Sequence, residues 1–265
     1  LKAFLTEQEY EEARASVLNA HYTAPIIIEK MYEALNRLGF DGGRVLEPAA
    51  GIGNFFGSMP ESMRKNSRLF GVELDSISAR IAAKIYPEAQ VAHAGFEETN
   101  FADNSFDLVI GNVPFGQYKV RDKGYDKENF LIHDYFIAKA LDKTREGGIV
   151  AVITSKGTMD KKDSRARAYF AQRADLISAI RLPNTAFKEN AGTEVTSDIL
   201  FFQKRKQPQM NALPSWTETS IKDGMEINRY FIDHPEMVLG KMQLVTGPYG
   251  PESVCLPNDT GASLS

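Results

Sequence analysis

The sequence predicts an α/β protein with a doubly wound, mostly parallel sheet. Two observations lead to this fold class. Short apolar runs that are typical of buried strands alternate with helical segments between residues 44 and 110. Small or acidic residues stand where the first two runs end, from Glu47 to Gly53 and at Glu73. Because the carboxyl ends of parallel strands meet at one sheet edge, where α/β proteins bind ligands, we expect the site there.

Length and composition are those of an ordinary globular protein. The 265 residues suffice for one large domain, or for one domain with an appendage. No apolar stretch is long enough to span a membrane, and the acidic start is unlike a signal peptide. The single cysteine, Cys255, favours a reducing compartment, so we expect a cytoplasmic protein. The net charge of −4 argues against a protein that coats nucleic acid non-specifically.

Two helices are expected before the first strand. Thr6 and Glu9 form a capping box, which predicts a helix to about Ala20. A second helix should start near Pro25 and end before Gly39, because apolar residues recur along one of its faces. We assign residues 1–40 to an N-terminal helical extension.

The first strand, residues 44–47, runs into a turn of small residues that leads to a helix. Small residues let the backbone approach a ligand closely, but only Gly51 and Gly53 match the glycine spacing of dinucleotide-binding turns. The carboxylate of Glu47 would repel a pyrophosphate and would accept hydrogen bonds from an ammonium group or a ribose. The expected ligand is therefore cationic or neutral rather than a dinucleotide.

The second strand, residues 68–73, also ends in an acid. An acid at the position of Glu73 typically hydrogen-bonds ribose hydroxyls. After a helix over 76–86 and a weak strand over 90–93, the fourth strand, 106–110, leads to Asn112-Val113-Pro114-Phe115. An amide, a backbone bend and an aromatic ring suit a nucleobase, because the amide accepts its N–H and the ring stacks on its face. Taken alone, these four residues are equally compatible with an ordinary proline-containing turn.

The later segments complete the sheet. A lysine-rich loop, a helix over 129–144 and three apolar runs follow, at residues 149–154, 176–182 and 197–203. The connection over 183–192 is long, and its length suggests function. We assign residues 41–206 to the ligand-binding domain. Beyond Lys206 the composition turns to proline, glycine and polar residues, so we expect a linker and a C-terminal appendage over 207–265, which contain the only tryptophan, Trp216.

Several chemistries are disfavoured by what the sequence lacks. It has no phosphate-binding G-x-x-x-x-G-K-[ST] loop, no H-E-x-x-H and no cysteine cluster. The four histidines show no metal-ligand spacing: His21, His93, His133 and His234. Hydride transfer, phosphoryl transfer and zinc hydrolysis are therefore disfavoured, and no metal site is expected.

Two groups of basic residues are candidates for contact with nucleic acid, although each group alone is better read as a solvated surface. One group follows the Asn112 motif, and the other follows the strand over 149–154: Lys119, Arg121, Lys123 and Lys127, then Lys156, Lys161, Lys162, Arg165 and Arg167.

Three segments together resemble the motifs of S-adenosylmethionine-dependent N6-adenine DNA methyltransferases. They are Glu47-Pro48-Ala49-Ala50-Gly51-Ile52-Gly53, Gly71-Val72-Glu73-Leu74-Asp75 and Asn112-Val113-Pro114-Phe115. The resemblance covers about Tyr22 to Lys204, and its motif order is that of the gamma group. The chain is also similar to methylase domains of large helicase-linked proteins of bacterial mobile elements.

The resemblance implies a seven-stranded Rossmann-like methyltransferase fold, S-adenosylmethionine as cofactor, DNA with an adenine target as partner, and further domains such as a helicase in the full-length protein. The first residue is Leu1 rather than Met, which fits a part of a longer polypeptide.

The resemblance also implies roles for individual residues. In the cofactor site, Glu47 would face the methionine end of the cofactor, and Thr23 would contact the carboxylate at that end. Glu73 would hold the ribose, and Phe96 would pack near the adenine. Small residues would give the cofactor room: Ala49, Gly51 and Gly53. In the catalytic motif, Asn112 and the carbonyl of Val113 would accept the two hydrogens of the target amine, next to Pro114. Phe115 and Phe187 would stack on the flipped base, and Lys119 and Arg121 would contact the substrate.

Two residues depart from the family pattern. Val113 stands where the family usually has a proline, and Gly95 stands where an aspartate often contacts the amino group of the cofactor. These departures keep open a nucleic-acid-binding module that has lost turnover. Methyl transfer to RNA guanine or to a protein glutamine amide also stays open, because this type of motif recurs in enzymes with those substrates. A nicotinamide-dependent enzyme fits the sheet but not the glycine spacing.

Overall fold

The computed structural model describes residues 23–187, 194–209, 212–247 and 250–258. Its centre is a seven-stranded sheet with the strand order β3-β2-β1-β4-β5-β7-β6. Strands β1 to β5 pair in parallel, and only β7 runs antiparallel to its neighbours β5 and β6. The strand bounds are β1 Gly43–Glu47, β2 Ser67–Glu73, β3 Gln90–His93, β4 Phe106–Asn112, β5 Thr144–Ser155, β6 Ala174–Leu182 and β7 Ser197–Lys204. The expected mostly parallel seven-stranded sheet is confirmed.

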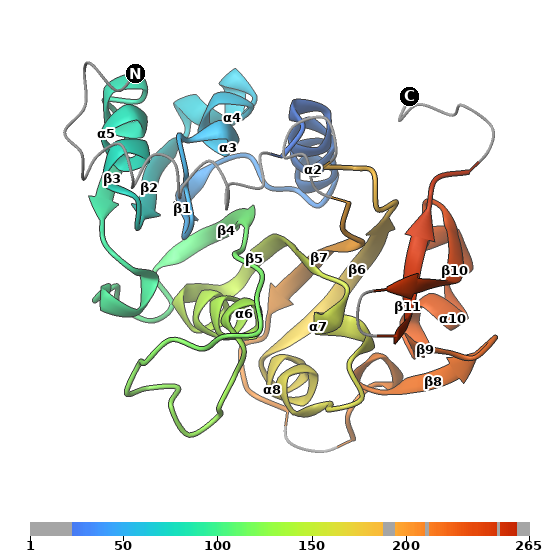
Figure 1. Ribbon diagram of the computed structural model, residues 1–265. Helices are drawn as coiled ribbons and strands as arrows, with labels where there is room; N and C mark the ends of the chain where they lie inside the picture. Colours follow the sequence, from blue (N-terminus) through green and yellow to red (C-terminus); the bar gives the residue numbers. More distant parts are fainter. Residues whose placement is uncertain (1–22, 188–193, 210–211, 248–249, 259–265) are drawn as a thin grey trace.

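Helices cover both faces of the sheet (Figure 1). One face carries α2 (Pro25–Arg37), α3 (Asn54–Gly57), α4 (Glu61–Lys65) and α5 (Ser76–Ile85). The opposite face carries α6 (Ile132–Lys143) and α8 (Arg165–Arg173), with the short α7 (Gly157–Asp160) before α8. The expected helix over 129–144 thus begins three residues later, at Ile132. No helix in the described ranges is long and apolar enough to cross a membrane.

Side chains alternate between the two faces along the central strand β5. On β5, Ile149, Ala151 and Ile153 pack in the cluster that contains α2, whereas Val150 and Val152 pack in the cluster that contains α6 and α8. Since both faces are covered, both sets are apolar, and the strand reads in the sequence as a continuous apolar run.

Both ends of the described chain belong to this core. Helix α2 buries its apolar face against the sheet, and the helix expected up to Ala20 lies outside the described residues.

After β7 come two hairpins, with α10 (Arg229–Asp233) between them. The first hairpin consists of β8 (Thr219–Lys222) and β9 (Met225–Asn228), and the second of β10 (Lys241–Gly247) and β11 (Gly250–Leu256). Trp216 and Phe231 pack in the same cluster as α6 and α8. The segment expected as a linker and appendage therefore contributes to the core.

Candidate functional site

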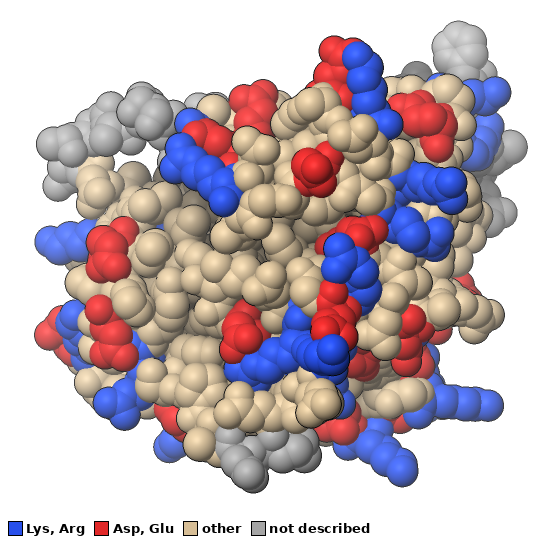
Figure 2. Space-filling view, turned by 180° about the vertical axis from the view of Figure 1, so that it is seen from behind, with Lys and Arg blue, Asp and Glu red and all other residues tan. Residues whose placement is uncertain are grey.

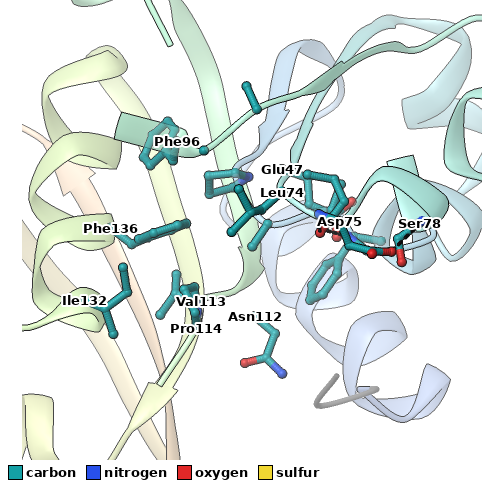
Figure 3. A pocket seen from close by; sticks show the side chains of 18 of the residues that line it. Glu47, Leu74, Asp75, Ser78, Phe96, Asn112, Val113, Pro114, Ile132 and Phe136 are labelled. Atoms are coloured by element: carbon teal, nitrogen blue, oxygen red, sulfur yellow. Dashed lines mark hydrogen bonds between the residues drawn. The ribbon is translucent and has the colours of Figure 1, made fainter. Parts of the chain in front are cut away.

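A cavity of about 490 Å³ opens at the carboxyl edge of the sheet, where β1, β2, β3 and β4 end. Figure 3 shows the side chains that line it. The structure brings nine of the expected site residues together around this cavity: Thr23, Glu47, Ala49, Gly51, Glu73, Phe96, Asn112, Val113 and Pro114. These residues come from segments far apart in the sequence, and they meet because the strand ends are neighbours in the sheet.

The turn after β1 depends on two glycines with positive φ. Gly51 has φ 53° and lines the cavity. Gly53, with φ 87°, begins α3, and a Cβ at this position would lie 2.6 Å from the ring of Tyr86. Gly53 does not line the cavity. In this structure Gly53 lets the turn pack closely against Tyr86, whereas the expectation was that it gives the cofactor room.

Glu73 joins the turns that follow β1 and β2. Its carboxylate accepts hydrogen bonds from the main-chain nitrogen of Gly51, at 2.6 Å, and of Asp75, at 2.8 Å. Asp75 in turn caps α5 by accepting from the nitrogen of Ser78 at 2.7 Å. Because each carboxylate oxygen can accept more than one hydrogen bond, Glu73 is held in place and retains capacity for a ribose hydroxyl.

Glu47 is a buried acid at the cavity wall, with 2% of its surface exposed. Its Oε2 makes no hydrogen bond to any part of the chain that the structure describes. Burial, and secondly the charge of Glu73, raise the pKa of Glu47 well above the ordinary carboxyl range. A buried carboxylate oxygen without a donor fits a ligand with a cationic group, such as the sulfonium or ammonium of S-adenosylmethionine.

The cavity has an apolar side and a polar side (Figure 3). Phe96, Ile132 and Phe136 lie on one side, and Asp75 and Ser78 lie on the other. Flat rings are stabilised by contact with apolar and aromatic side chains, whereas sugar hydroxyls and charged groups need hydrogen-bond partners. The arrangement fits a ligand that carries an aromatic ring at one end and polar, cationic groups at the other.

Asn112 stands at the end of β4, beside this cavity. Its Nδ2 donates a hydrogen bond to Oγ1 of Thr23 at 3.2 Å, and both residues line the cavity. Thr23 therefore contacts Asn112 of the expected catalytic motif as well as the space expected for the cofactor. The amide nitrogen of Asn112 therefore faces Thr23.

The structure explains why Val113 is compatible with this site. Its nitrogen donates to the carbonyl oxygen of Ile153 at 3.0 Å, and its side chain is buried in the core. A proline at this position would have no N–H and would leave that oxygen without its donor. The valine thus extends the pairing of β4 and β5 by one residue.

The expected aromatic partners of the base lie elsewhere. Phe187 has 0% of its surface exposed and packs in the cluster that contains α2, so the expectation that it stacks on a base is wrong for this conformation. Phe115 is half-buried, touches both hydrophobic clusters and does not line the cavity. Phe187 sits in the core, and Phe115 packs against it, because the sheet must bury apolar area on its two faces.

The basic residues also separate into different roles. Lys119 and Arg121 are exposed, and Lys119 donates to Oδ1 of Asn129 at 2.7 Å. Arg167, in contrast, is fully buried and donates to the carbonyl oxygens of Thr158 and Thr217. Lys161 pairs with Asp134, and Arg165 pairs with Asp163. Three members of the second basic group are therefore buried or paired with an acid. Figure 2 shows basic and acidic side chains intermixed over the face of the molecule that is turned away from the viewer in Figure 1.

Several residues of the cavity wall were not expected from the sequence. Leu74 and Asp75 directly follow Glu73 in the sequence, and this position is the signal that could have identified them as residues of the cavity wall. Ile132 and Phe136 lie one helical turn apart on α6, a spacing that also occurs in any buried helix. Across the described ranges, no group of three histidine, cysteine or acidic side chains is placed to hold a metal ion.

Comparisons with known sequences agree with this geometry. The family model described as "Eco57I restriction-modification methylase" matches residues 6–187. The chain is 30% identical over 211 residues to the "Defense against restriction protein B" of Escherichia phage P1, which covers 77% of this chain and 9% of that protein. It is 27% identical over 195 residues to the "Type II methyltransferase M.CvrRI" of Paramecium bursaria Chlorella virus XZ-6E, which covers 69% of this chain and 48% of that protein. The chain therefore spans less than half of the length of these relatives.

Solved structures share the fold. A Listeria monocytogenes structure described as a class I S-adenosylmethionine-dependent methyltransferase has a TM-score of 0.60 at 18% identity, covering 79% of this chain and 72% of that chain. A type I restriction-modification methyltransferase subunit of Streptococcus thermophilus has a TM-score of 0.60 at 15% identity, covering 81% and 52%. At these identities the similarity shows the fold alone, and it confirms the expected Rossmann-like methyltransferase fold.

Proposed function

Because the chain belongs to the Eco57I restriction-modification methylase family, we propose that it methylates DNA at N6 of an adenine flipped out of the duplex. The observation that carries the proposal is the position of Asn112-Val113-Pro114-Phe115 at the end of β4, beside a cavity with an apolar and an acidic side. The expected cofactor, S-adenosylmethionine, agrees with the family and the fold. Its adenine, ribose and cationic groups match the two sides of the cavity.

When bound, S-adenosylmethionine supplies an electrophilic methyl group. Asn112 accepts one hydrogen of the target amine through its side-chain oxygen, and the main-chain carbonyl of Val113 accepts the other. These two acceptors orient the amine and stabilise the positive charge that develops on its nitrogen. Methyl transfer to an amine needs no covalent enzyme intermediate, and the proton leaves after transfer without a dedicated base.

Flipping the adenine costs a few kcal/mol, which contacts in the site must offset. Hydrogen bonds to Asn112 and Val113 provide part of this energy. Lys119 and Arg121, which are exposed on the loop that follows the motif, contact the DNA backbone.

The proposal is tested by methyl transfer from tritiated S-adenosylmethionine to DNA, RNA and protein acceptors, followed by mass spectrometry of the digested nucleosides. The wild-type chain should label DNA and produce N6-methyladenine. Asn112→Ala should lower the rate by at least about 100-fold, because it removes one of two aligned groups that stabilise the transition state. Asn36→Ala, an exposed asparagine on α2, serves as the matched control and should keep the wild-type rate.

Three outcomes would contradict the proposal. Equal labelling of DNA by the wild type and by Asn112→Ala would rule out Asn112 as a catalytic residue. Label that enters only RNA or only protein would rule out DNA as the substrate. Cofactor binding without transfer to any acceptor would favour a binding module that has lost turnover.

A further inference from the structure

The loop after β3 carries a carboxylate against a glycine. Gly95 precedes the short 3-10 helix η1 (Phe96–Glu98), and its nitrogen donates to Oε2 of Glu98 at 2.9 Å. A Cβ built on Gly95 would collide with the carboxylate of Glu97, whose Cδ lies 2.6 Å from that position. The side chain of Glu97 therefore occupies the space that a side chain at position 95 would enter.

Glu97 has no structural partner that explains this placement. Its carboxylate makes no hydrogen bond or ion pair with any of the described residues, whereas its neighbour Glu98 holds the nitrogen of Gly95. Lys139, which packs against this loop, donates to the carbonyl oxygen of Phe96 at 2.8 Å and to Oδ2 of Asp122 at 2.8 Å. Lys139 thus fixes the main chain of η1 and leaves the Glu97 carboxylate available to a ligand.

The surroundings of this carboxylate restrict what it binds. Glu97 lines the cavity together with Phe96, Ile132 and Phe136, which form its apolar side. An aromatic ring is stabilised by those side chains, and a carboxylate at the ring edge accepts hydrogen bonds only from N–H or O–H groups. The cationic and sugar parts of a ligand already have acceptors in Glu47 and Glu73, which come from other strands.

We propose that Glu97 recognises the amino group on the adenine of S-adenosylmethionine and so determines the cofactor base that this cavity accepts. This inference rests on the proposed function, because it takes the cofactor from it. Glycine at position 95 leaves this space to the Glu97 carboxylate, which comes two residues further along the chain than an acidic residue at position 95 would.

The test is isothermal titration calorimetry with S-adenosylhomocysteine and with S-inosylhomocysteine, in which an oxygen replaces the amino group. The wild-type protein should bind the amino compound at least about ten-fold more tightly, since a hydrogen bond to a charged group contributes this much. Glu97→Gln should bring the two affinities within about two-fold of each other, because an amide can also donate to the oxygen. Glu29→Gln, an exposed glutamate on α2, is the matched control and should keep the wild-type discrimination.

A second pair of variants tests the geometry. Gly95→Asp alone should weaken binding of both compounds, because its side chain displaces the carboxylate of Glu97 from this position. Combining Gly95→Asp with Glu97→Gly removes the collision and should restore a preference for the amino compound.

The two proposals fail in different ways. If the wild-type protein binds neither compound, the cofactor in the proposed function is wrong. If the wild type binds S-adenosylhomocysteine and Glu97→Gln keeps the same discrimination, the role of Glu97 is wrong while the proposed function stands.

Discussion

Glu47 has opposite effects on stability and on binding. Its pKa is raised in the folded protein, so the folded state holds this proton at pH values where an unfolded chain has lost it. The contribution of Glu47 to folding stability therefore falls as the pH rises above about 4.3, the ordinary glutamate pKa. A cationic ligand favours the charged carboxylate and lowers the pKa again. Binding of the cofactor should release a proton.

We expect this proton release to be measurable by calorimetry at about pH 6, where the cofactor ammonium is still protonated. The enthalpy of S-adenosylmethionine binding should differ between two buffers of different ionisation enthalpy, and affinity should rise with pH. Glu47→Gln should remove the difference, weaken binding and stabilise the free protein by on the order of 1–3 kcal/mol, since the amide is buried at lower cost than the carboxylate. Identical enthalpies in both buffers for the wild type would rule out this role.

At the scale of elements, one buried lysine connects the loop after β3 with the loop after β4. Lys139 on α6 is 3% exposed and binds the Phe96 carbonyl oxygen and the Asp122 carboxylate. Asp122 also accepts from the hydroxyl of Tyr135 at 2.8 Å. The lysine-rich loop between β4 and α6 is thus held by buried polar contacts at its middle.

Lys139→Met should destabilise the protein by about 3 kcal/mol, because Asp122 would lose its buried counter-charge. Urea unfolding measures this loss. Lys65→Met removes a lysine of an exposed ion pair on α4 and should change stability by less than about 1 kcal/mol. Adding Asp122→Asn to Lys139→Met should recover part of the loss. If both single lysine variants unfold alike, the contact does not hold the loop.

At the scale of the whole molecule, a buried arginine joins the sheet to the C-terminal segment. Arg181 on β6 donates to both oxygens of Asp198 on β7, at 2.8 and 2.9 Å, and pairs with Asp160 at 2.7 Å. Its guanidinium lies 4.2 Å from the ring centre of Phe231 on α10. Because a buried guanidinium needs all of these partners, the C-terminal segment and the sheet should unfold together.

Unfolding curves followed by far-ultraviolet circular dichroism and by the fluorescence of Trp216 should therefore coincide. Phe231→Ala should lower the stability by about 3 kcal/mol and shift both curves equally, because it empties a core position. Ile221→Ala on β8, which is 67% exposed, should shift neither by more than about 0.5 kcal/mol. A fluorescence transition that precedes the dichroism transition would show that the segment is a separate unit.

The sequence by itself determined the strands of the central sheet and the edge at which they present ligand-binding groups, whereas the hairpins after Lys206 were not expected. Alternating or continuous apolar runs and turn residues are local signals, and the parallel arrangement brings Glu47, Glu73 and Asn112 to one edge whatever the side chains between them do. For the same reason, two motifs that each follow the carboxyl end of a parallel strand can be predicted to lie close together without any knowledge of side-chain packing.

Only the tertiary structure decided which side chains face the cavity and which fill the core. Phe187 is aromatic and Arg167 is basic, as residues that bind a base or a phosphate often are. Both are nevertheless buried by segments remote in sequence. Ile132, Phe136 and Glu97 form cavity walls because α6 and η1 pack beside the end of β4. Long-range packing sets these positions, and no local pattern of residues contains it.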